Sequence, residues 1–253
     1  FKNRIGKTDA IIDHDQEFAL YKCEALSNKI RHHFPIDPNK KKYSLSAITR
    51  LWKKKSLGIN GIYLWGSVGR GKTIMMDTML NSLPDNFYRR IHFHRFMYEV
   101  HERLSSLKNQ TDPLKIVGKQ ISSNIRILGL DEIFVIDISD AMILYGLLKS
   151  LTNNGVILIF TSNTPPDFLY KNGLQRERFL PAIQLIQDHT EVIKIPGSRD
   201  YRLETLNLAP TYFTPHTEVA EKQMQAIIFR IDPSSSIAPA QININSRRVP
   251  IIA

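Results

Sequence analysis

An eight-residue glycine-rich stretch constrains the fold of this chain more than any other feature. It reads Gly66-Ser67-Val68-Gly69-Arg70-Gly71-Lys72-Thr73. The apolar run 62–65 precedes it, and residues 74–80 follow with the composition of a helix. A strand, a loop of the pattern G-x-x-x-x-G-K-[ST] and a helix start, in this order, form the context that a phosphate-binding P-loop requires. The sequence therefore predicts that these eight residues bind a nucleoside triphosphate.

The residue types in this stretch suit phosphate and magnesium chemistry. Glycines let successive backbone N–H groups point inward, and the dipole of the following helix also favours an anion. Lys72 reaches the β- and γ-phosphates of ATP as a mobile point charge. Thr73 offers a hydroxyl to Mg²⁺, which prefers oxygen ligands in octahedral geometry. The alternative, a glycine-rich surface turn with a solvated lysine, does not account for the flanking strand and helix patterns.

Length and composition indicate one substantial hydrophobic core with at most a small appendage, since 42% of the 253 residues are hydrophobic. No apolar run approaches the roughly 20 residues of a membrane span. The single cysteine, Cys23, excludes an intrachain disulfide and suits a reducing compartment. The first residue is Phe1 and nothing resembles a signal peptide, so we expect a trimmed start.

The net charge of +10 makes a nucleic acid or an anionic membrane surface an alternative partner. The basic runs are short and dispersed, and they have no interleaved aromatic residues of the kind that stack on bases. They lie at 40–42, 53–55, 89–90 and 247–248. We therefore favour solvated basic faces over a dedicated polyanion-binding patch.

Apolar periodicity predicts the order of the secondary-structure elements. Strands are expected at 61–65, 91–96, 126–131, 156–161 and 191–195. Helices are expected at 15–32, 44–55, 97–107, 144–151, 174–187 and 218–230, with a further helix opened by Pro113. Asp137, Ser139 and Asp140 are expected to cap the start of the helix that contains 144–151. The chain ends in a strand-like segment.

Two adjacent carboxylates, Asp131 and Glu132, follow the apolar strand 126–131. Open α/β sheets place their sites at this carboxyl end of the strands. Asp131 can hold Mg²⁺, and Glu132 can orient and polarise an attacking water. Such a pair can also cap a helix, but together with an upstream P-loop it favours ATP hydrolysis.

Other polar residues lie near the ends of predicted elements. Asn163 follows the strand 156–161 and is expected to be level with Asp131, where an amide can sense the γ-phosphate; turn chemistry is the simpler explanation from this pattern alone. His92, His94 and His101 suggest a metal site, but no carboxylate or cysteine lies at ligand spacing from them. We therefore expect no metal at the histidines.

These segments together resemble the ZapE family of AAA+ ATPases, a bacterial cell-division group with mitochondrial relatives. The resemblance runs from about residue 15 to the end of the chain. It rests on Tyr63–Thr73, His92–Met97, Asp131–Glu132, Asp137–Ile138, Asp140–Met142, Thr161–Asn163, Gly173–Arg176, Arg178–Ile183 and Asp200–Arg202. The histidine segment and residues 173–183 are more specific for the family than the P-loop is.

The resemblance implies roles for three residues. Asn163 is implied to be the sensor that follows the fourth strand. Arg178 becomes the first candidate for an arginine finger, with Arg176 second, acting on ATP that a neighbouring subunit binds. The alternative is that both arginines lie on a helix surface or form local ion pairs.

The fold that the resemblance implies is α/β: a P-loop NTPase of the AAA+ type, with a five-stranded parallel sheet and helices on both faces. The expected domains are an N-terminal helical segment 1–55, the ATPase core 56–205 and a C-terminal extension 206–253. AAA+ modules normally continue into a helical lid. Because no helix follows the strand-like end, we expect this chain to lack the lid.

The function expected from these features is Mg²⁺-dependent ATP hydrolysis coupled to remodelling of protein partners. By resemblance, the partner is the FtsZ ring of dividing bacteria. The resemblance also implies a cytoplasmic protein that is recruited to the division site at the inner membrane and forms an ATP-dependent homo-oligomer. Two alternatives remain: a P-loop kinase, and a nucleotide-controlled module that tethers the chain to membrane or nucleic acid, as a helicase loader does.

Overall fold

The structure is a computed structural model that describes residues 14–34, 58–85, 87–107, 110–196, 217–231, 240–244 and 247–251. The chain divides into two compact units, Phe1–Asp200 and Tyr201–Ala253. The predicted helix 44–55 and the segment Asp200–Arg202 lie outside the described residues.

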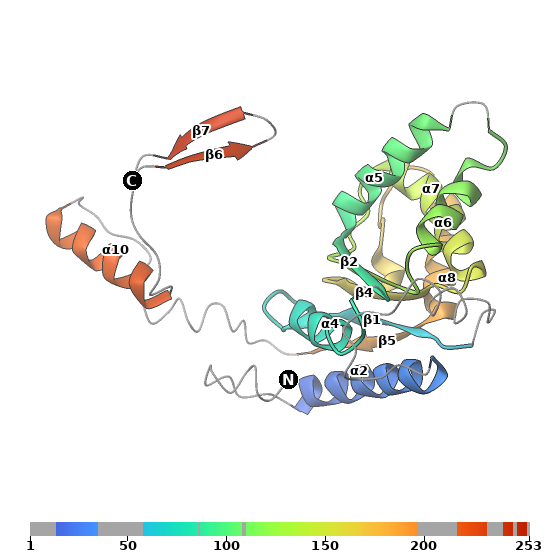
Figure 1. The fold of residues 1–253 in the computed structure, drawn as a ribbon, viewed down its shortest axis with the longest axis horizontal. Helices are drawn as coiled ribbons and strands as arrows, with labels where there is room; N and C mark the ends of the chain where they lie inside the picture. Colours follow the sequence, from blue (N-terminus) through green and yellow to red (C-terminus); the bar gives the residue numbers. More distant parts are fainter. Residues whose placement is uncertain are drawn as a thin grey trace. The chain divides into compact units, whose positions relative to one another are not determined.

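The first unit contains a five-stranded sheet, its covering helices and two short 3₁₀ turns (Figure 1). In chain order its elements are α2 (His14–His33), β1 (Gly61–Trp65), α4 (Lys72–Leu80), β2 (Tyr88–His92), α5 (Phe93–Ser106), α6 (Pro113–Ser122), β3 (Ile127–Asp131), α7 (Ile138–Asn153), β4 (Ile157–Ser162), η1 (Pro166–Phe168), η2 (Arg176–Arg178), α8 (Leu180–His189) and β5 (Thr190–Lys194). The described part of the second unit is a helix, α10 (Glu218–Ile231), and an antiparallel hairpin of β6 (Ala240–Ile244) and β7 (Arg247–Ile251).

The sheet of the first unit has the strand order β2-β3-β4-β1-β5, and all four pairings are parallel. Strand β1 lies between β4 and β5, so Ile62 pairs with Ile159 on one side and with Glu191 on the other. Parallel sheets with helices on both faces need strands that are apolar throughout. In strands β1, β3 and β4 all but one residue is buried, and the polar residues Asp131, Thr161 and Ser162 stand at the C-terminal ends of β3 and β4.

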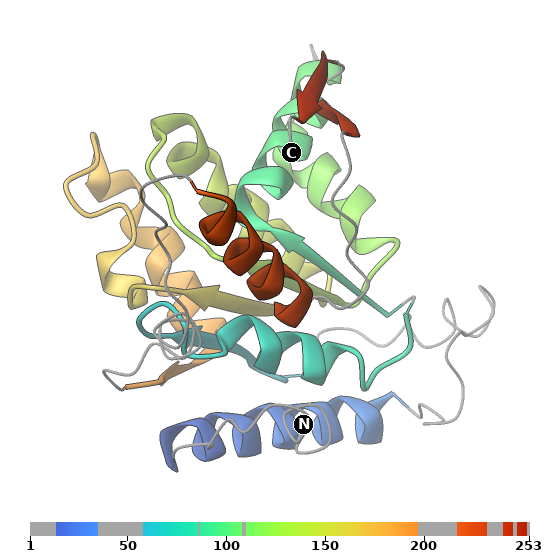
Figure 2. The same ribbon diagram turned by 90° about the vertical axis from the view of Figure 1, so that its left-hand side faces the viewer.

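Two hydrophobic cores fill the space on the two faces of the sheet. Helices α2 and α4 run side by side over one face, as both views show (Figures 1 and 2). They pack Cys23 and Met76 against strand residues such as Ile62. Helices α5, α6, α7 and α8 supply the other core, which contacts the alternate strand residues, including Tyr63 and Phe160. The expected sheet with helices on both faces is confirmed.

Among the described elements, the strand and helix bounds agree with the sequence prediction to within a few residues except at two places. Strand β2 spans Tyr88–His92 and α5 begins at Phe93, so the predicted strand 91–96 started three residues late and was wrong beyond residue 92. The alternation of His and Phe misled the prediction, because Phe93, Phe96, Met97 and Val100 are all buried and recur at helical spacing.

The second correction concerns the expected helix 174–187. Arg176–Arg178 form a 3₁₀ turn, and α8 starts only at Leu180. Pro181 in the first turn of α8 explains the late start, since proline is tolerated there but not in a helix interior. Gln175 has a positive φ of 55°, which no α-helix accommodates. The two arginines therefore lie before the helix and not on it.

No described helix combines the length and the apolarity that crossing a bilayer requires.

Candidate nucleotide-binding site

The P-loop connects the end of β1 to the start of α4, as the sequence predicts. Gly71, at the helix N-cap, has φ 74°, a left-handed conformation that side-chain-bearing residues rarely adopt. Gly66 is required for a different reason. A Cβ atom at this position would lie 2.4 Å from the carbonyl oxygen of Ile195, which follows the neighbouring strand β5. The loop therefore passes close to the β5 backbone, and its last N–H groups lie at the positive end of α4, where anions bind.

Lys72 is buried, and its ammonium group donates hydrogen bonds inside the loop. The acceptors are the carbonyl oxygens of Gly66 and Ser67, both at 2.7 Å, and Oδ1 of Asn163 at 3.0 Å. Asn163 directly follows β4, so this contact joins the P-loop to the end of the adjacent strand. The structure thus brings together Lys72 and the predicted sensor, whose side chain points at the P-loop lysine.

The Asp131 carboxylate ends β3 beside Thr73 and is fully buried. Its Oδ1 accepts hydrogen bonds from the Thr73 hydroxyl at 3.0 Å and from the Thr161 hydroxyl of β4 at 2.5 Å. Its Oδ2 accepts a hydrogen bond from the Arg90 guanidinium of β2. A carboxylate and a hydroxyl, both oxygen donors, adjacent to a phosphate-binding loop fit the ligand preference of Mg²⁺.

Glu132 leaves the sheet in a strained conformation, with φ 57° and a side chain that is 66% exposed. Contacts with β4 hold this turn in place. The Glu132 N–H donates to Thr161 Oγ1 at 2.8 Å, and the Ile133 N–H donates to the Thr161 carbonyl at 2.8 Å. Non-glycine residues with positive φ cost about 1–3 kcal/mol and recur at functional sites. Glu132 therefore projects from the same edge of the sheet as Asp131, accessible to water.

Tyr63 of β1 holds the loop after β4 in place. Its side chain lies on the face of the sheet that α5, α6, α7 and α8 cover. The Tyr63 hydroxyl donates to the carbonyl of Thr164 at 2.9 Å. Burial raises the pKa of this phenol well above its usual range, so the hydroxyl remains a donor at physiological pH. Tyr63 thereby fixes the backbone next to Asn163.

The two arginines of η2 have different surroundings. The Arg176 guanidinium donates to the carbonyls of Leu169, at 2.5 Å, and of Asp167, at 2.6 Å, and so ties η2 to the preceding 3₁₀ turn. Arg178 is exposed, and within the described residues its guanidinium makes no hydrogen bond or ion pair. Neither arginine contacts Lys72 or Asp131 in the described chain.

Three residues near the site carry roles that sequence reasoning missed or misplaced. The Arg70 side chain, predicted at the phosphates with the rest of the loop, is 1% exposed and donates to the carbonyl of Pro196 at 2.5 Å. Thr161 and Arg90 both hold Asp131, a role that sequence reasoning did not assign to either. Thr161 was noted only within the segment Thr161–Asn163 and Arg90 only within a basic run, whereas the sheet order places both on strands next to β3.

The histidines do not converge. His92 Nδ1 lies 3.6 Å from Asp131 Oδ2 and 4.0 Å from Glu132 Oε2. His94 is exposed on α5. His101 Nε2 contacts Asp140 Oδ1 at 2.7 Å. Within the described residues, no group of three or more His, Cys, Asp or Glu side chains could hold a metal ion.

Asp137 caps α7 as predicted. Its carboxylate accepts hydrogen bonds from the backbone N–H and the hydroxyl of Ser139, both at 2.6 Å. These bonds lower the pKa of Asp137 below its usual value, because they favour the charged carboxylate.

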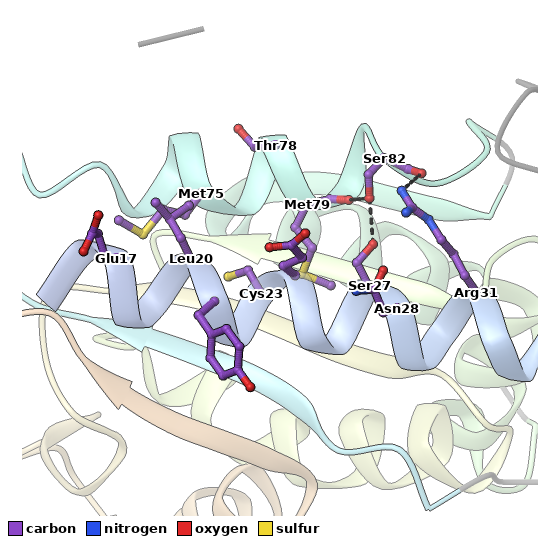
Figure 3. Close-up of a pocket in the computed structure, with 12 residues that line it drawn as sticks. Glu17, Leu20, Cys23, Ser27, Asn28, Arg31, Met75, Thr78, Met79 and Ser82 are labelled. Atoms are coloured by element: carbon purple, nitrogen blue, oxygen red, sulfur yellow. Dashed lines mark hydrogen bonds between the residues drawn. The ribbon is translucent and has the colours of Figure 1, made fainter. Parts of the chain in front are cut away.

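A cavity of about 530 Å³ lies away from the P-loop, between α2 and α4 (Figure 3). Leu20, Cys23, Met75 and Met79 line it, and so do Ser27 and Ser82, whose hydroxyls form a hydrogen bond of 2.7 Å. None of its lining residues belongs to the P-loop, so this cavity is not the phosphate site.

A parallel sheet in the order β2-β3-β4-β1-β5, with a P-loop after β1 and paired carboxylates after β3, defines the core of a P-loop NTPase of the AAA+ type. The family model for the AFG1-like ATPases matches residues 1–253, and the chain belongs to this family.

Relatives with curated names support this assignment. The cell division protein ZapE of Escherichia coli K12 is 42% identical over 219 residues, which are 85% of this chain and 58% of that protein. Lactation elevated protein 1 homolog B of Danio rerio is 32% identical over 203 residues, 75% of this chain and 40% of that protein. The chain thus spans less than two thirds of the length of either relative.

Among solved structures, domain III of the Thermotoga maritima replication initiation protein DnaA matches with a TM-score of 0.49 and 14% identity. The match covers 89% of this chain and 73% of that one.

Proposed function

We propose that this chain is the catalytic core of a Mg²⁺-dependent ATP hydrolase that remodels protein partners. One observation carries the proposal. The contacts of Lys72 with Asn163 and of Thr73 with Asp131 link the P-loop to the ends of β4 and β3. Lysine, hydroxyl, carboxylate and amide thus converge at one edge of the sheet, where open α/β folds bind their ligands.

The site residues divide the chemistry among them. The loop backbone and Lys72 hold the phosphates, and Thr73 and Asp131 hold the metal. When bound, Mg²⁺ would neutralise charge on the phosphate oxygens. Glu132 is exposed next to Asp131, so its carboxylate can orient a water for attack on the γ-phosphate. Asn163 exchanges its contact with Lys72 for one to the γ-phosphate, and so reports whether ATP or ADP is bound.

Arg178 is the proposed arginine finger, acting on the nucleotide of a neighbouring copy in a homo-oligomer. Its exposed guanidinium supports the proposal, because a finger must reach outside its own subunit. Arg176 serves a different purpose. Its bonds to two backbone carbonyls hold the turn that presents Arg178. Arg176 is therefore the less suitable finger.

The proposed protein partner is FtsZ. The E. coli relative is named a cell division protein, and the resemblance of the motifs to the ZapE family suggests the same partner here. The test is ATPase activity with and without FtsZ polymers, for this chain and for a version extended at its C-terminus by the remainder of the protein. Stimulation of the extended version by FtsZ supports the proposal; phosphate release that FtsZ leaves unchanged contradicts the partner but not the hydrolase.

Two outcomes would favour another function. Transfer of phosphate to an added small-molecule acceptor, without release in its absence, would identify a kinase. Salt-sensitive binding to single-stranded DNA or to anionic vesicles, without turnover, would identify a tethering module, which the net charge of +10 makes worth testing.

A further inference from the structure

Adjacent arginines on β2 point to opposite faces of the sheet. Arg89 bonds Glu99 of α5 at 2.5 Å on the face away from the P-loop helix. Arg90 faces α4 and contacts two carboxylates. Its Nε lies 3.2 Å from Asp77 Oδ1, and its Nη2 is bonded to Asp131 Oδ2. This alternation follows from the pleat of a strand, which turns successive side chains to opposite faces.

The contact with Arg90 occupies the remaining oxygen of the candidate metal ligand. Asp131 Oδ1 already accepts from Thr73 and Thr161, and the side chain is 1% exposed. A buried carboxylate needs a compensating charge, and the guanidinium supplies it. A metal ion at the same carboxylate would be repelled by this positive charge and would need the same lone pairs.

Asp77 provides a second position for the guanidinium. It lies one helical turn after Thr73 on α4, so Thr73 and Asp77 face β2 and β3 together. The Asp77 side chain is 39% exposed, compared with 1% for Asp131. An ion pair between Arg90 and Asp77 alone is therefore partly exposed to water. Arg90 can release Asp131 to a metal ion and still have its own charge paired with Asp77.

We propose that Arg90 competes with the divalent metal: it neutralises Asp131 while no metal is bound, and it keeps only its contact with Asp77 when the metal binds. The inference rests on the proposed function, since it needs Thr73 and Asp131 to be metal ligands. It has a consequence for the order of binding. A metal ion that binds alone must displace the Arg90 guanidinium from Asp131. A metal ion that arrives with ATP is also attracted by the phosphate charges, which offset the loss of the Arg90–Asp131 ion pair. Arg90 thus makes metal binding depend on nucleotide.

The test measures binding of Mn²⁺, as a spectroscopic substitute for Mg²⁺, by electron paramagnetic resonance, with and without a non-hydrolysable ATP analogue. In Arg90→Gln we expect Mn²⁺ to bind about tenfold more tightly in the presence of the analogue, because a charged hydrogen bond no longer competes. We also expect Arg90→Gln to bind Mn²⁺ measurably without nucleotide. Arg89→Gln is the matched control, since it removes the adjacent arginine and its ion pair on the other face, and its Mn²⁺ affinity should equal that of the wild type.

Two further variants separate competition from a purely structural role. Arg90→Lys keeps the positive charge, but its single ammonium group replaces a guanidinium that contacts both Asp77 and Asp131. The lysine should therefore compete less strongly for Asp131, and the Mn²⁺ affinity should lie between those of the wild type and Arg90→Gln. Asp77→Asn should weaken Mn²⁺ binding in the wild-type background, because Arg90 then stays on Asp131. The same substitution should have no effect in Arg90→Gln.

The outcomes that would overturn the inference are distinct from those that would overturn the proposed function. If all variants bind the analogue but Arg90→Gln binds Mn²⁺ no more tightly than the wild type, Arg90 does not compete with the metal. An equal loss from Asp77→Asn in both backgrounds would show that Asp77 acts on the metal directly, against the proposed movement. If neither the wild type nor Arg90→Gln binds Mn²⁺ with the analogue, the proposed function fails and the inference fails with it.

Discussion

At the scale of the residue, the candidate site is organised around buried charges that already have partners. Lys72 donates to three oxygen atoms and Asp131 accepts from three side chains. A charged group that is held in this way is oriented before the ligand arrives, which lowers the entropy cost of binding. The same contacts must be exchanged when nucleotide binds, so these two buried residues should affect stability as well as affinity.

Lys72→Ala should abolish ATP binding, because the lysine supplies the mobile positive charge of the loop. It should also lower the free energy of unfolding by about 1–3 kcal/mol, since the loop carbonyls and Asn163 lose a charged donor. Calorimetric titration with ATP and urea denaturation measure the two effects. Lys119→Ala, on the exposed side of α6, is the control for loss of one lysine. Undiminished ATP affinity in Lys72→Ala would refute the assignment of the P-loop.

Glu132→Gln should bind Mg²⁺–ATP as the wild type does and turn it over at least a hundredfold more slowly in the complete protein. The amide keeps the shape of the side chain but loses the charge that polarises water, a general-base contribution of about 10²–10⁴. Because the side chain is exposed, the substitution should leave the thermal unfolding midpoint unchanged within error. Phosphate release at the wild-type rate would show that another group activates the water.

At the scale of the element, apolar runs were sufficient to predict β1, β3, β4 and β5 within one residue of their bounds. The local sequence pattern gave the wrong bounds at two helix starts. At the start of α5 the residues fit both the strand and the helix periodicity, and at α8 the helix begins only at Leu180, because Pro181 belongs in the first turn. The P-loop and Asp131–Glu132 could be recognised because the residues of each motif are contiguous in the sequence. The partners of Asp131 on β2 and β4 were not, because only the sheet order brings Arg90 and Thr161 beside it.

The packing of α2 on α4 leads to a prediction about the single cysteine. Cys23 is 3% exposed on the buried side of α2, and burial raises the pKa of its thiol from 9.0 to about 12. At pH 8 the reactive thiolate should be roughly a thousandfold rarer in the native chain than in the unfolded chain. Iodoacetamide should therefore alkylate Cys23 rapidly in urea and very slowly without it. Rapid alkylation of the native chain would mean that the cavity between α2 and α4 admits reagents to the sulfur.

The same shift makes stability depend on pH in a defined window. Because the folded pKa is raised, the contribution of the neutral thiol is fully present below pH 9 and is lost as the pH rises toward 12. At pH 10 the loss should be about 1 kcal/mol. The measurement is the difference in unfolding free energy between the wild type and Cys23→Ala at pH 8 and at pH 10, which cancels the titration of other groups. An unchanged difference would show that Cys23 is not isolated from water.

At the scale of the whole molecule, the site is proposed to be completed by a neighbouring copy of the chain. Asn163, Asp131 and Glu132 lie at the P-loop edge of the sheet, whereas Arg178 is exposed in the turn before α8 and contacts neither Lys72 nor Asp131 in the described chain. An isolated chain should therefore bind nucleotide without the full rate of hydrolysis. The rate should rise with protein concentration as assembly proceeds.

Arg178→Ala should leave ATP affinity within about twofold of the wild type but lower hydrolysis by about 10³-fold or more in the assembled, C-terminally extended protein. Mixing Arg178→Ala subunits with Lys72→Ala subunits should restore part of the activity, because an intact nucleotide site then meets an intact finger across one interface. Arg176→Ala is the informative comparison and should lower the thermal midpoint as well as the rate, since it releases two backbone carbonyls. If the mixture stays inactive while both variants assemble, Arg178 does not act between subunits.

The position of β1 between β4 and β5 has a consequence for how the chain is made. During synthesis, β1 is made before both strands that pair with it. Ile62 cannot pair until Ile159 of β4 has been synthesised, and Gly61 cannot pair until Thr190 of β5 has been synthesised. At ordinary elongation rates that delay is on the order of ten seconds. During this time the nascent polypeptide exposes a fully apolar strand with both edges unpaired, which is the kind of segment that chaperones bind and that aggregates when they are scarce. Codon choice between residues 66 and 190, as well as the amino-acid sequence, should therefore influence how much correctly folded protein a cell obtains.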